Sequence, residues 1–222
     1  MKKFAVIVAG GSGLRMGATS PKQFLLLKGK PLLRHTIDAF LDAYNDMQVI
    51  VVLPKDYLEF GNTMIDEMID KNRIQITTGG ATRFHSVQNG LKLINETSII
   101  FVHDGVRSLV SQTLIQQCFE QAVEKGSAIP AVAATDSIRL ANGEESSVAN
   151  RNNIRIIQTP QTFKSDILLP AFNQEYEEKF TDEATVVEAF GTKVFLCEGD
   201  YNNIKITRPI DLLLAENILN QL

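Results

Sequence analysis

The segment VIVAGGSGLRMGATSPKQF, from Val6 to Phe24, decides the fold of the chain. It starts as an apolar run of strand length, breaks into glycines, and continues with an arginine and a Pro-Lys pair. Glycines leave backbone N–H groups accessible to a ligand, and the two cations add positive charge. The segment therefore predicts the first strand of an α/β sheet, followed by a loop that binds a phosphate chain.

Further apolar runs of strand length alternate with helical patterns along the chain. We expect strands at Phe4–Ala9, Gln48–Leu53, Arg73–Thr77, Ser98–Val102, Ser127–Val132 and Lys193–Cys197. Apolar residues recur at helical spacing in 32–41, 64–69 and 87–94, and a last helix is expected to start with Thr207 as its N-cap. This alternation is typical of an α/β, Rossmann-like fold, with a mostly parallel sheet flanked by helices. We expect residues 1–222 to form a single domain.

One region, Ala134–Gln161, interrupts the alternation. It contains Asn-Gly and Glu-Glu-Ser-Ser turn sequences between two short strand-like pieces, Ser137–Leu140 and Ile154–Ile157. No helix fits inside it, so we interpret the region as a protruding β-hairpin arm. Because an isolated hairpin is marginally stable, the arm is expected to pack on a second subunit.

Composition limits the classes of partner. Hydrophobic residues make up 44% of the 222 residues and charged residues 22%, and the formal net charge is −4, which argues against nucleic acid or an anionic membrane. No apolar stretch approaches a membrane span, and the first residues, MKKFAVIVAGG, are interpreted as a strand rather than a signal peptide. Cys118 and Cys197 lack the spacing of a disulfide or metal pair, so we expect a reducing, cytoplasmic location.

Ligands of open α/β sheets bind at the carboxyl ends of the strands, so polar residues there are the candidates for chemistry. After the first strand come Gly10, Gly11, Gly13 and Gly17. The spacing of Gly11, Gly13 and Gly17 is one residue too long for the dinucleotide fingerprint, and the loop lacks the Gly-Lys-Ser/Thr of a Walker motif. Arg15 and Lys22 could hold a triphosphate from two sides and stabilise the charge that builds on phosphorus. A dinucleotide-binding turn or a flexible loop is the alternative.

The stretch TTGGATRFHSVQNG follows the third expected strand. Its glycines, Gly80 among them, allow close approach of a flat ring, and Ser86, expected at the start of the next helix, could read a base. The alternative is an ordinary loop with a helix N-terminus near Thr82.

The remaining candidates follow later strands. Asp104 is placed where a carboxylate can hold Mg²⁺ between phosphates, and Arg107 could clamp an anion or form a structural salt bridge with it. His103 is interpreted as a hydrogen-bonded core residue. Lys205 is expected on the solvated face of an extended segment, and Thr181 as a helix N-cap.

Six stretches, AGGSGLRMG…PKQF, GGATRFHSV, VHDGVR, TPQTF, TDEA and NIKITRP, occur in this order over essentially the whole chain. On these residues the chain resembles the 2-C-methyl-D-erythritol 4-phosphate cytidylyltransferases of the non-mevalonate isoprenoid pathway and their relatives that act on ribitol 5-phosphate. The resemblance implies a nucleotidyltransferase that converts CTP and a polyol phosphate into a CDP-polyol and pyrophosphate with Mg²⁺. It also implies a homodimer in which the arm of one subunit reaches into the other.

The resemblance further implies a role for each matching residue. Arg15 and Lys22 would be catalytic and stabilise the transition state. The implied nucleotide-binding residues are Ala9, Gly10, Gly11, Gly13, Gly80, Ser86 and Lys205. The implied acceptor-binding residues are Asp104, which would also bind Mg²⁺, Arg107, Ser137, Arg151 and Thr181. Ser137 stands where the family commonly has threonine, and Arg83 is given no role beyond shaping its loop.

Three alternatives remain. Ribitol 5-phosphate could replace 2-C-methyl-D-erythritol 4-phosphate as the acceptor, although the TDEA, NIKITRP and arm segments resemble the latter branch more closely. A regulatory module that binds a nucleotide without turnover would not need both cations. An NAD-dependent oxidoreductase is disfavoured by the glycine spacing and by the lack of an acidic residue at the end of a second strand.

Overall fold

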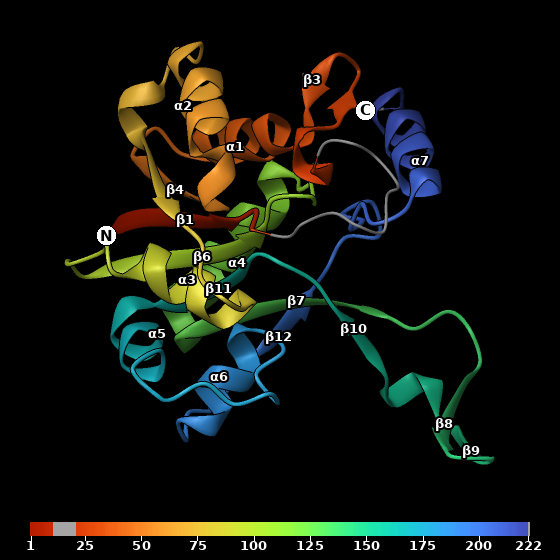
Figure 1. The fold of residues 1–222 in the computed structure, drawn as a ribbon. Helices are drawn as coiled ribbons and strands as arrows, with labels where there is room; N and C mark the ends of the chain where they lie inside the picture. Colours follow the sequence, from red (N-terminus) through yellow and green to blue (C-terminus); the bar gives the residue numbers. More distant parts are fainter. Residues whose placement is uncertain (11–20, 222) are drawn as a thin grey trace.

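Within residues 1–10 and 21–221, which the computed structural model describes, eight strands form one mixed sheet (Figure 1). The strands lie in the order β10-β7-β11-β6-β1-β4-β5, and β12 pairs with β7. Their bounds are β1 Lys2–Val8, β4 Met47–Leu53, β5 Ile74–Thr78, β6 Ser98–Asp104, β7 Ser127–Ala133, β10 Arg155–Ile157, β11 Gln161–Lys164 and β12 Leu196–Glu198. Strands β5, β4, β1 and β6 are mutually parallel, whereas β11 and β10 run antiparallel to their neighbours.

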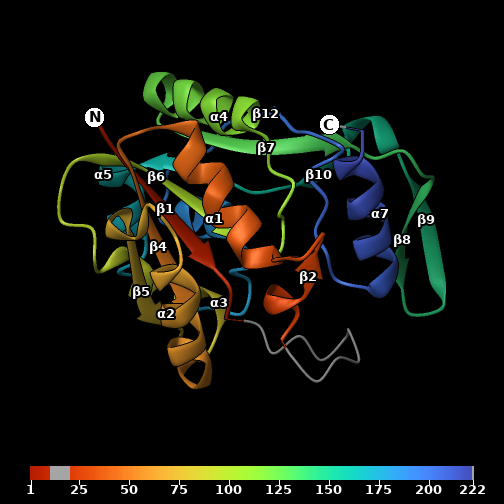
Figure 2. The same cartoon turned by 90° about the horizontal axis from the view of Figure 1, so that it is seen from above.

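Helices cover both faces of this sheet. They are α1 Leu32–Ala43, α2 Leu58–Asp66, α3 Arg83–Leu91, α4 Gln112–Lys125, α5 Ser165–Ala171 and α6 Glu183–Ala189. The remaining helix, α7 Pro209–Leu219, belongs to a separate small core. Figure 2 shows α1, α2 and α4 together over one face. Side chains alternate along β1, so that Ala5 and Ile7 pack with these helices while Phe4 and Val6 pack with α3, α5 and α6 on the other face. The predicted mostly parallel sheet flanked by helices is confirmed.

Short elements connect the larger ones. They are β2 Leu26–Leu27, β3 Lys30–Pro31, β8 Ile138–Asn142, β9 Glu145–Ala149 and the 3₁₀ turns Lys22–Phe24, Lys55–Tyr57, Lys71–Arg73 and Arg151–Asn153. Helix α7 packs on β2 and on the loop before it, where Leu27, Ile206 and Ala215 form a small third core. No helix in the described part of the chain has the length and apolar character needed to cross a bilayer.

The predicted hairpin forms, but with a different partner strand. Strand β8 pairs with β9 across the turn at Gly143, and this hairpin projects away from the sheet (Figure 1). The prediction that Ile154–Ile157 is its second strand is wrong: Ile156 pairs with Val132, as part of β10 on β7. β8 pairs with β9 rather than with the more distant Ile154–Ile157, because closing the shorter connection costs less chain entropy.

Two helix N-caps lie one residue later than predicted. The N-cap of α6 is Asp182 rather than Thr181, because the Asp182 carboxylate accepts the Thr185 N–H at 2.9 Å. The N-cap position of α7 is Arg208 rather than Thr207, and the Asp211 carboxylate accepts the N–H groups of both residues. In each case a carboxylate provides the stronger acceptor for exposed N–H groups.

Two further differences from the sequence-based expectations concern a short strand and the residues just after a helix. Strand β11 was not predicted, because four residues between longer elements carry little periodic signal. Ile69 was expected in the core with Met68, but α2 ends at Asp66 and Ile69 is 99% exposed. Helical periodicity cannot be extended past the last hydrogen-bonded turn.

Candidate functional site

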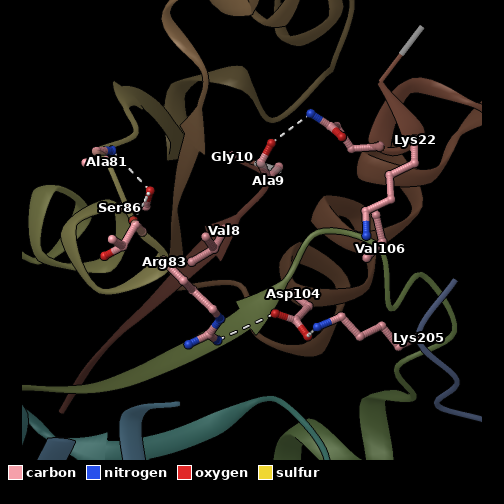
Figure 3. A pocket seen from close by; sticks show the side chains of 13 residues that line it. Val8, Ala9, Gly10, Lys22, Ala81, Arg83, Ser86, Asp104, Val106 and Lys205 are labelled. Atoms are coloured by element: carbon pink, nitrogen blue, oxygen red, sulfur yellow. Dashed lines mark hydrogen bonds and ion pairs between the residues drawn. The ribbon is translucent and has the colours of Figure 1, made fainter. Parts of the chain in front are cut away.

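The candidate site lies where the order in which strands are added to the sheet reverses. From β1 the chain adds β4 and β5 on one side, and it then crosses to add β6 on the other side. Such a switch point opens a crevice at the carboxyl ends of the two central strands. A cavity of about 310 Å³ lies there, after β1 and β6 (Figure 3). The predicted site residues that line it are Ala9, Gly10, Lys22, Gly80, Ser86, Asp104 and Lys205.

The end of β1 is fixed on both sides. The Ala9 N–H donates to the carbonyl of Val52 at 2.9 Å, and the buried Gln23 amide donates to the Ala9 carbonyl at 2.8 Å. Because Gln23 follows Lys22 in the same 3₁₀ turn, this bond holds the turn against the end of β1. Figure 3 shows the Lys22 side chain reaching into the pocket toward Val106.

A second wall of the pocket is built around Ser86. Its hydroxyl donates to the Thr82 carbonyl at 2.9 Å and accepts the Gly80 N–H at 3.1 Å. A Cβ at Gly80 would lie 2.4 Å from the Cβ of His85, so this close approach requires glycine. Thr82 is the N-cap of α3, as in the alternative interpretation, and Ser86 therefore lies within the first turn rather than at the helix start.

Asp104 is the anionic centre of the pocket. Its Oδ2 lies 2.9 Å from Lys205 Nζ, and its Oδ1 lies 3.5 Å from a guanidinium nitrogen of Arg83. Burial would raise the pKa of the Asp104 carboxyl, but Arg83, Lys205 and Arg107 outweigh burial and hold that pKa well below its usual range. Asp104 is therefore ionised throughout the neutral and mildly acidic range. The Lys205 side chain is 43% exposed, so the predicted solvation holds, but it also has this ion pair.

Arg83 and Glu183 form a pair that the sequence analysis missed. The Arg83 guanidinium donates through both terminal nitrogens to the two carboxylate oxygens of Glu183, which is fully buried at the start of α6. Burial raises the pKa of Glu183, although Arg83 opposes this shift, and burial lowers the pKa of Arg83 less than its two carboxylate partners raise it. Arg83 thus has more than the loop-shaping role assigned to it. An acidic residue in the first turn of a helix is ordinarily explained by the helix dipole, so the sequence carried no distinct signal for this pair.

Arg107 lies beneath the pocket rather than in its lining. It is buried, donates to the Asn203 carbonyl at 2.8 Å and stands 3.5 Å from Asp104. His103, also buried, contacts the Thr159 hydroxyl at 2.9 Å and the Arg107 carbonyl at 3.2 Å. Burial lowers the pKa of His103 to about 4, so it is neutral. The interpretation of His103 as a hydrogen-bonded core residue is confirmed.

Other predicted residues are not brought to this pocket. Ser137 and Arg151 are exposed on the arm, where Arg151 donates to the Thr135 carbonyl at 2.8 Å. Thr181 is exposed just before α6. The three predictions that concern Gly11, Gly13 and Arg15 lie outside the described residues.

The pocket combines three lysine and arginine side chains with one ionised carboxylate. Lys22, Arg83 and Lys205 line it together with Asp104. Such a set is suited to binding anions with several negative charges and to stabilising charge at phosphorus.

Comparisons with known proteins agree with this chemistry. A family model described as 2-C-methyl-D-erythritol 4-phosphate cytidylyltransferase matches residues 4–221. The protein of that name from Bacteroides fragilis is 45% identical over 99% of this chain and 100% of its own length. The one from Porphyromonas gingivalis is 42% identical over 98% of each.

Solved structures of enzymes with the same function as these relatives also align with this chain. The crystal structure of 4-diphosphocytidyl-2C-methyl-D-erythritol synthase from Anaerococcus prevotii aligns with a TM-score of 0.84 and 26% identity, covering 99% of this chain and 98% of that one. The 2-C-methyl-D-erythritol 4-phosphate cytidylyltransferase from Thermus thermophilus aligns with a TM-score of 0.75 and 31% identity, covering 97% and 98%.

Proposed function

We propose, because the chain belongs to the 2-C-methyl-D-erythritol 4-phosphate cytidylyltransferase family, that it transfers CMP from CTP to 2-C-methyl-D-erythritol 4-phosphate. The products are CDP-methylerythritol and pyrophosphate. The observation that carries this proposal is the match over residues 4–221, which includes every element of the pocket at the ends of β1 and β6. The roles of the individual residues are part of the proposal.

CTP would bind across the carboxyl end of β1. The backbone at Ala9 and Gly10, with Gly11 and Gly13, would cradle its phosphates. Gly80 and Ser86 would face the cytosine. The Ser86 hydroxyl both donates and accepts hydrogen bonds here, and its two present partners are backbone groups of the same loop, so its position is fixed before any ligand binds.

In the reaction, an oxygen of the acceptor phosphate attacks the α-phosphorus of CTP in line with the leaving group. A new P–O bond forms, the bond from the α-phosphorus to the bridging oxygen breaks, and pyrophosphate leaves. A phosphate monoester loses its second proton near pH 6, so no protein base is needed at neutral pH. Both reactants are anionic, and Arg15, Lys22 and Lys205 would reduce their repulsion and stabilise the charge that develops at phosphorus.

Mg²⁺ fits this pocket through Asp104. Mg²⁺ is usually held by one or two carboxylates together with substrate phosphates, rather than by a cage of protein ligands. The described residues contain no group of three or more His, Cys, Asp or Glu side chains that could hold a metal, and the carboxylate of Asp104 is ionised and lines the pocket. When bound, the ion would neutralise phosphate charge.

The acceptor side would need a second subunit. Thr181 would serve the acceptor from its own chain, with Arg107 acting through Asp104 from beneath the pocket. Ser137 and Arg151 would come from the arm of the partner in a two-fold homodimer. This proposal is supported by the arm itself: it projects from the sheet, and its Val148 is 75% exposed, so it gains stability by packing on another chain (Figure 1). We also propose a cytoplasmic location, with CTP and a polyol phosphate as the ligands.

Pyrophosphate release from CTP, measured with a panel of polyol phosphates, tests the proposed function. We expect the highest kcat/KM with 2-C-methyl-D-erythritol 4-phosphate. An apolar pocket discriminates a methyl group by only about 1–3 kcal/mol, so ribitol 5-phosphate would react about ten-fold to a few hundred-fold less well. A preference for ribitol 5-phosphate would overturn the acceptor while leaving CTP chemistry in place. CTP binding without pyrophosphate release for any acceptor would indicate a binding module.

A further inference from the structure

The two cysteines, 79 residues apart in the sequence, lie side by side in the fold. The Sγ atoms of Cys118 on α4 and Cys197 on β12 are 3.9 Å apart, and both side chains are thiols. A disulfide bond is about 2.05 Å long, so the two sulfurs need to approach by only about 2 Å. Neither cysteine is among the described residues that line the catalytic pocket, and the chemistry of the two thiols does not depend on the proposed function.

Hydrogen bonds from glutamine side chains of α4 to backbone carbonyls at β12 hold this approach in place. The Gln121 amide donates to the carbonyls of Phe195 and Leu196 at 3.2 and 3.3 Å, and the Gln117 amide donates to the carbonyl of Glu198 at 3.2 Å. These glutamines flank Cys118 on the same helix, and their acceptors flank Cys197. The strand is in turn paired in parallel with β7. The two thiols therefore face each other because two fixed elements meet, rather than through one adjustable side chain.

The two thiols differ in access and in acidity. Cys118 is buried, whereas Cys197 is partly exposed beside a cavity of about 440 Å³ that Glu198 and Tyr201 also line. The hydrogen bond between the thiols lowers the pKa of Cys197 and, together with burial, raises the pKa of Cys118. Cys197 is thus the thiol that an external reagent reaches first, and it is the one more easily converted to the thiolate that attacks disulfides.

We propose that Cys118 and Cys197 form a reversible disulfide within one chain by exchange with a small disulfide such as oxidised glutathione. The Cys197 thiolate attacks one sulfur of the small disulfide, which forms a mixed disulfide and releases one thiolate. Cys118 then loses its proton to solvent and attacks the Cys197 sulfur, which releases the second thiolate. The two protein thiols lose two electrons and two protons, and the small disulfide is reduced to two thiols.

The disulfide would change the stability of the folded chain. It closes a loop across the 79-residue separation and so removes conformational freedom from the unfolded chain. For a chain of this size we expect the melting temperature to rise by about 5 °C or more, less any strain from closing the last 2 Å. The chain runs from β12 through Gly199 toward Lys205, so the crosslink anchors the strand that precedes one pocket residue.

The test uses the native full-length protein with excess oxidised glutathione, followed by alkylation of the remaining thiols and non-reducing peptide mapping. We expect a linked peptide pair that contains Cys118 and Cys197, protection of both from alkylation, and a rise in melting temperature that dithiothreitol reverses. Cys118→Ser should stop at a glutathione adduct on Cys197, and Cys197→Ser should leave Cys118 as a thiol. If Cys118→Ser does not fold, Cys118→Ala provides the same comparison.

Three results would overturn the proposal. The wild-type protein could accumulate a stable glutathione adduct on Cys197 without closing the internal bond. The disulfide could form only between two chains, which non-reducing electrophoresis shows directly. Both thiols could also remain reactive toward the alkylating reagent after prolonged exposure to oxidised glutathione.

Discussion

Replacing Glu183 by glutamine tests how the pocket limits the contact between Arg83 and Asp104. In the wild type, Arg83 directs both terminal nitrogens to Glu183 and stands 3.5 Å from Asp104, which is longer than a hydrogen bond. Glutamine keeps the volume of the side chain but removes its charge. We expect Arg83 then to turn toward Asp104, the nearest remaining carboxylate, and to occupy an oxygen that the proposed Mg²⁺ needs.

The expected magnitude follows from burial. Breaking a fully buried ion pair costs about 3–5 kcal/mol, because one charge is left without its partner. The Glu183 side chain is 1% exposed but that of Arg83 is 29% exposed, so water recovers part of this cost. We expect a loss of about 2–3 kcal/mol in the free energy of unfolding, which lowers the melting temperature by about 5–10 °C. Loss of a residue that orients a metal ligand typically weakens metal binding or activity by about 10- to 100-fold.

Pyrophosphate release at saturating CTP, titrated with Mg²⁺, measures the functional part. Glu183→Gln should raise the Mg²⁺ concentration for half-maximal rate by about ten-fold or more, with a smaller change in the KM for CTP. Glu188→Gln, an exposed position on the same helix, is the matched control and should change neither the titration nor the melting temperature. A Glu183→Gln protein with the wild-type Mg²⁺ titration would refute the reasoning, even if its stability were reduced.

Four further outcomes are expected. Lys22→Ala should reduce kcat by about 100-fold or more with an unchanged melting curve, and near-normal kcat would remove Lys22 from the chemistry. EDTA should abolish activity, and Asp104→Asn should reduce it strongly. Full activity of either sample would mean that lysine and arginine side chains neutralise the phosphates without Mg²⁺. Mixed dimers of Lys22→Ala and Arg151→Ala subunits should regain activity, because one site per dimer has both residues, and no recovery after subunit exchange would exclude a site shared between chains. Because His103 is neutral in the folded state and its pKa is lowered from 6.5 to about 4, the unfolded chain takes up the proton first as pH falls. Stability should therefore drop by about 3 kcal/mol between pH 6.5 and 4, and His103→Gln should remove this slope in pH-dependent denaturation.

The sheet could be predicted from the sequence because its strands are buried on both faces. Continuous apolar runs such as Gln48–Leu53 leave little freedom for any other structure, and the observed β4 extends this run by one residue. The arm was harder, because its strands are exposed and carry no such constraint. There, a two-residue turn decided the pairing, and Ile154–Ile157 was free to pair with the edge of the main sheet instead.

Much of the pocket could also be predicted, because its residues lie directly after strands whose carboxyl ends must meet. Asp104 at the end of β6 and Gly10 just after β1 are brought together by topology alone. Glu183 could not be found in this way. It comes from a helix 100 residues away from Arg83, and the pair depends on how α6 packs against the sheet rather than on any strand end. The contact of Cys118 with Cys197 was missed for the same reason.

Asp104 and Glu183 differ in whether their cationic partner can leave when substrates bind. The Lys205 side chain is 43% exposed, and Asp104 keeps Arg83 and Arg107 beside it when Lys205 leaves, so this contact opens at a lower cost. A bound triphosphate can therefore take Lys205, while Asp104 becomes available to the cation that accompanies the nucleotide. The Arg83 contact with Glu183 is buried and bidentate, and opening it would leave a carboxylate without a counter-ion inside the protein. We therefore expect Lys205 to move between the empty and the loaded pocket, and Arg83 to stay where Glu183 holds it.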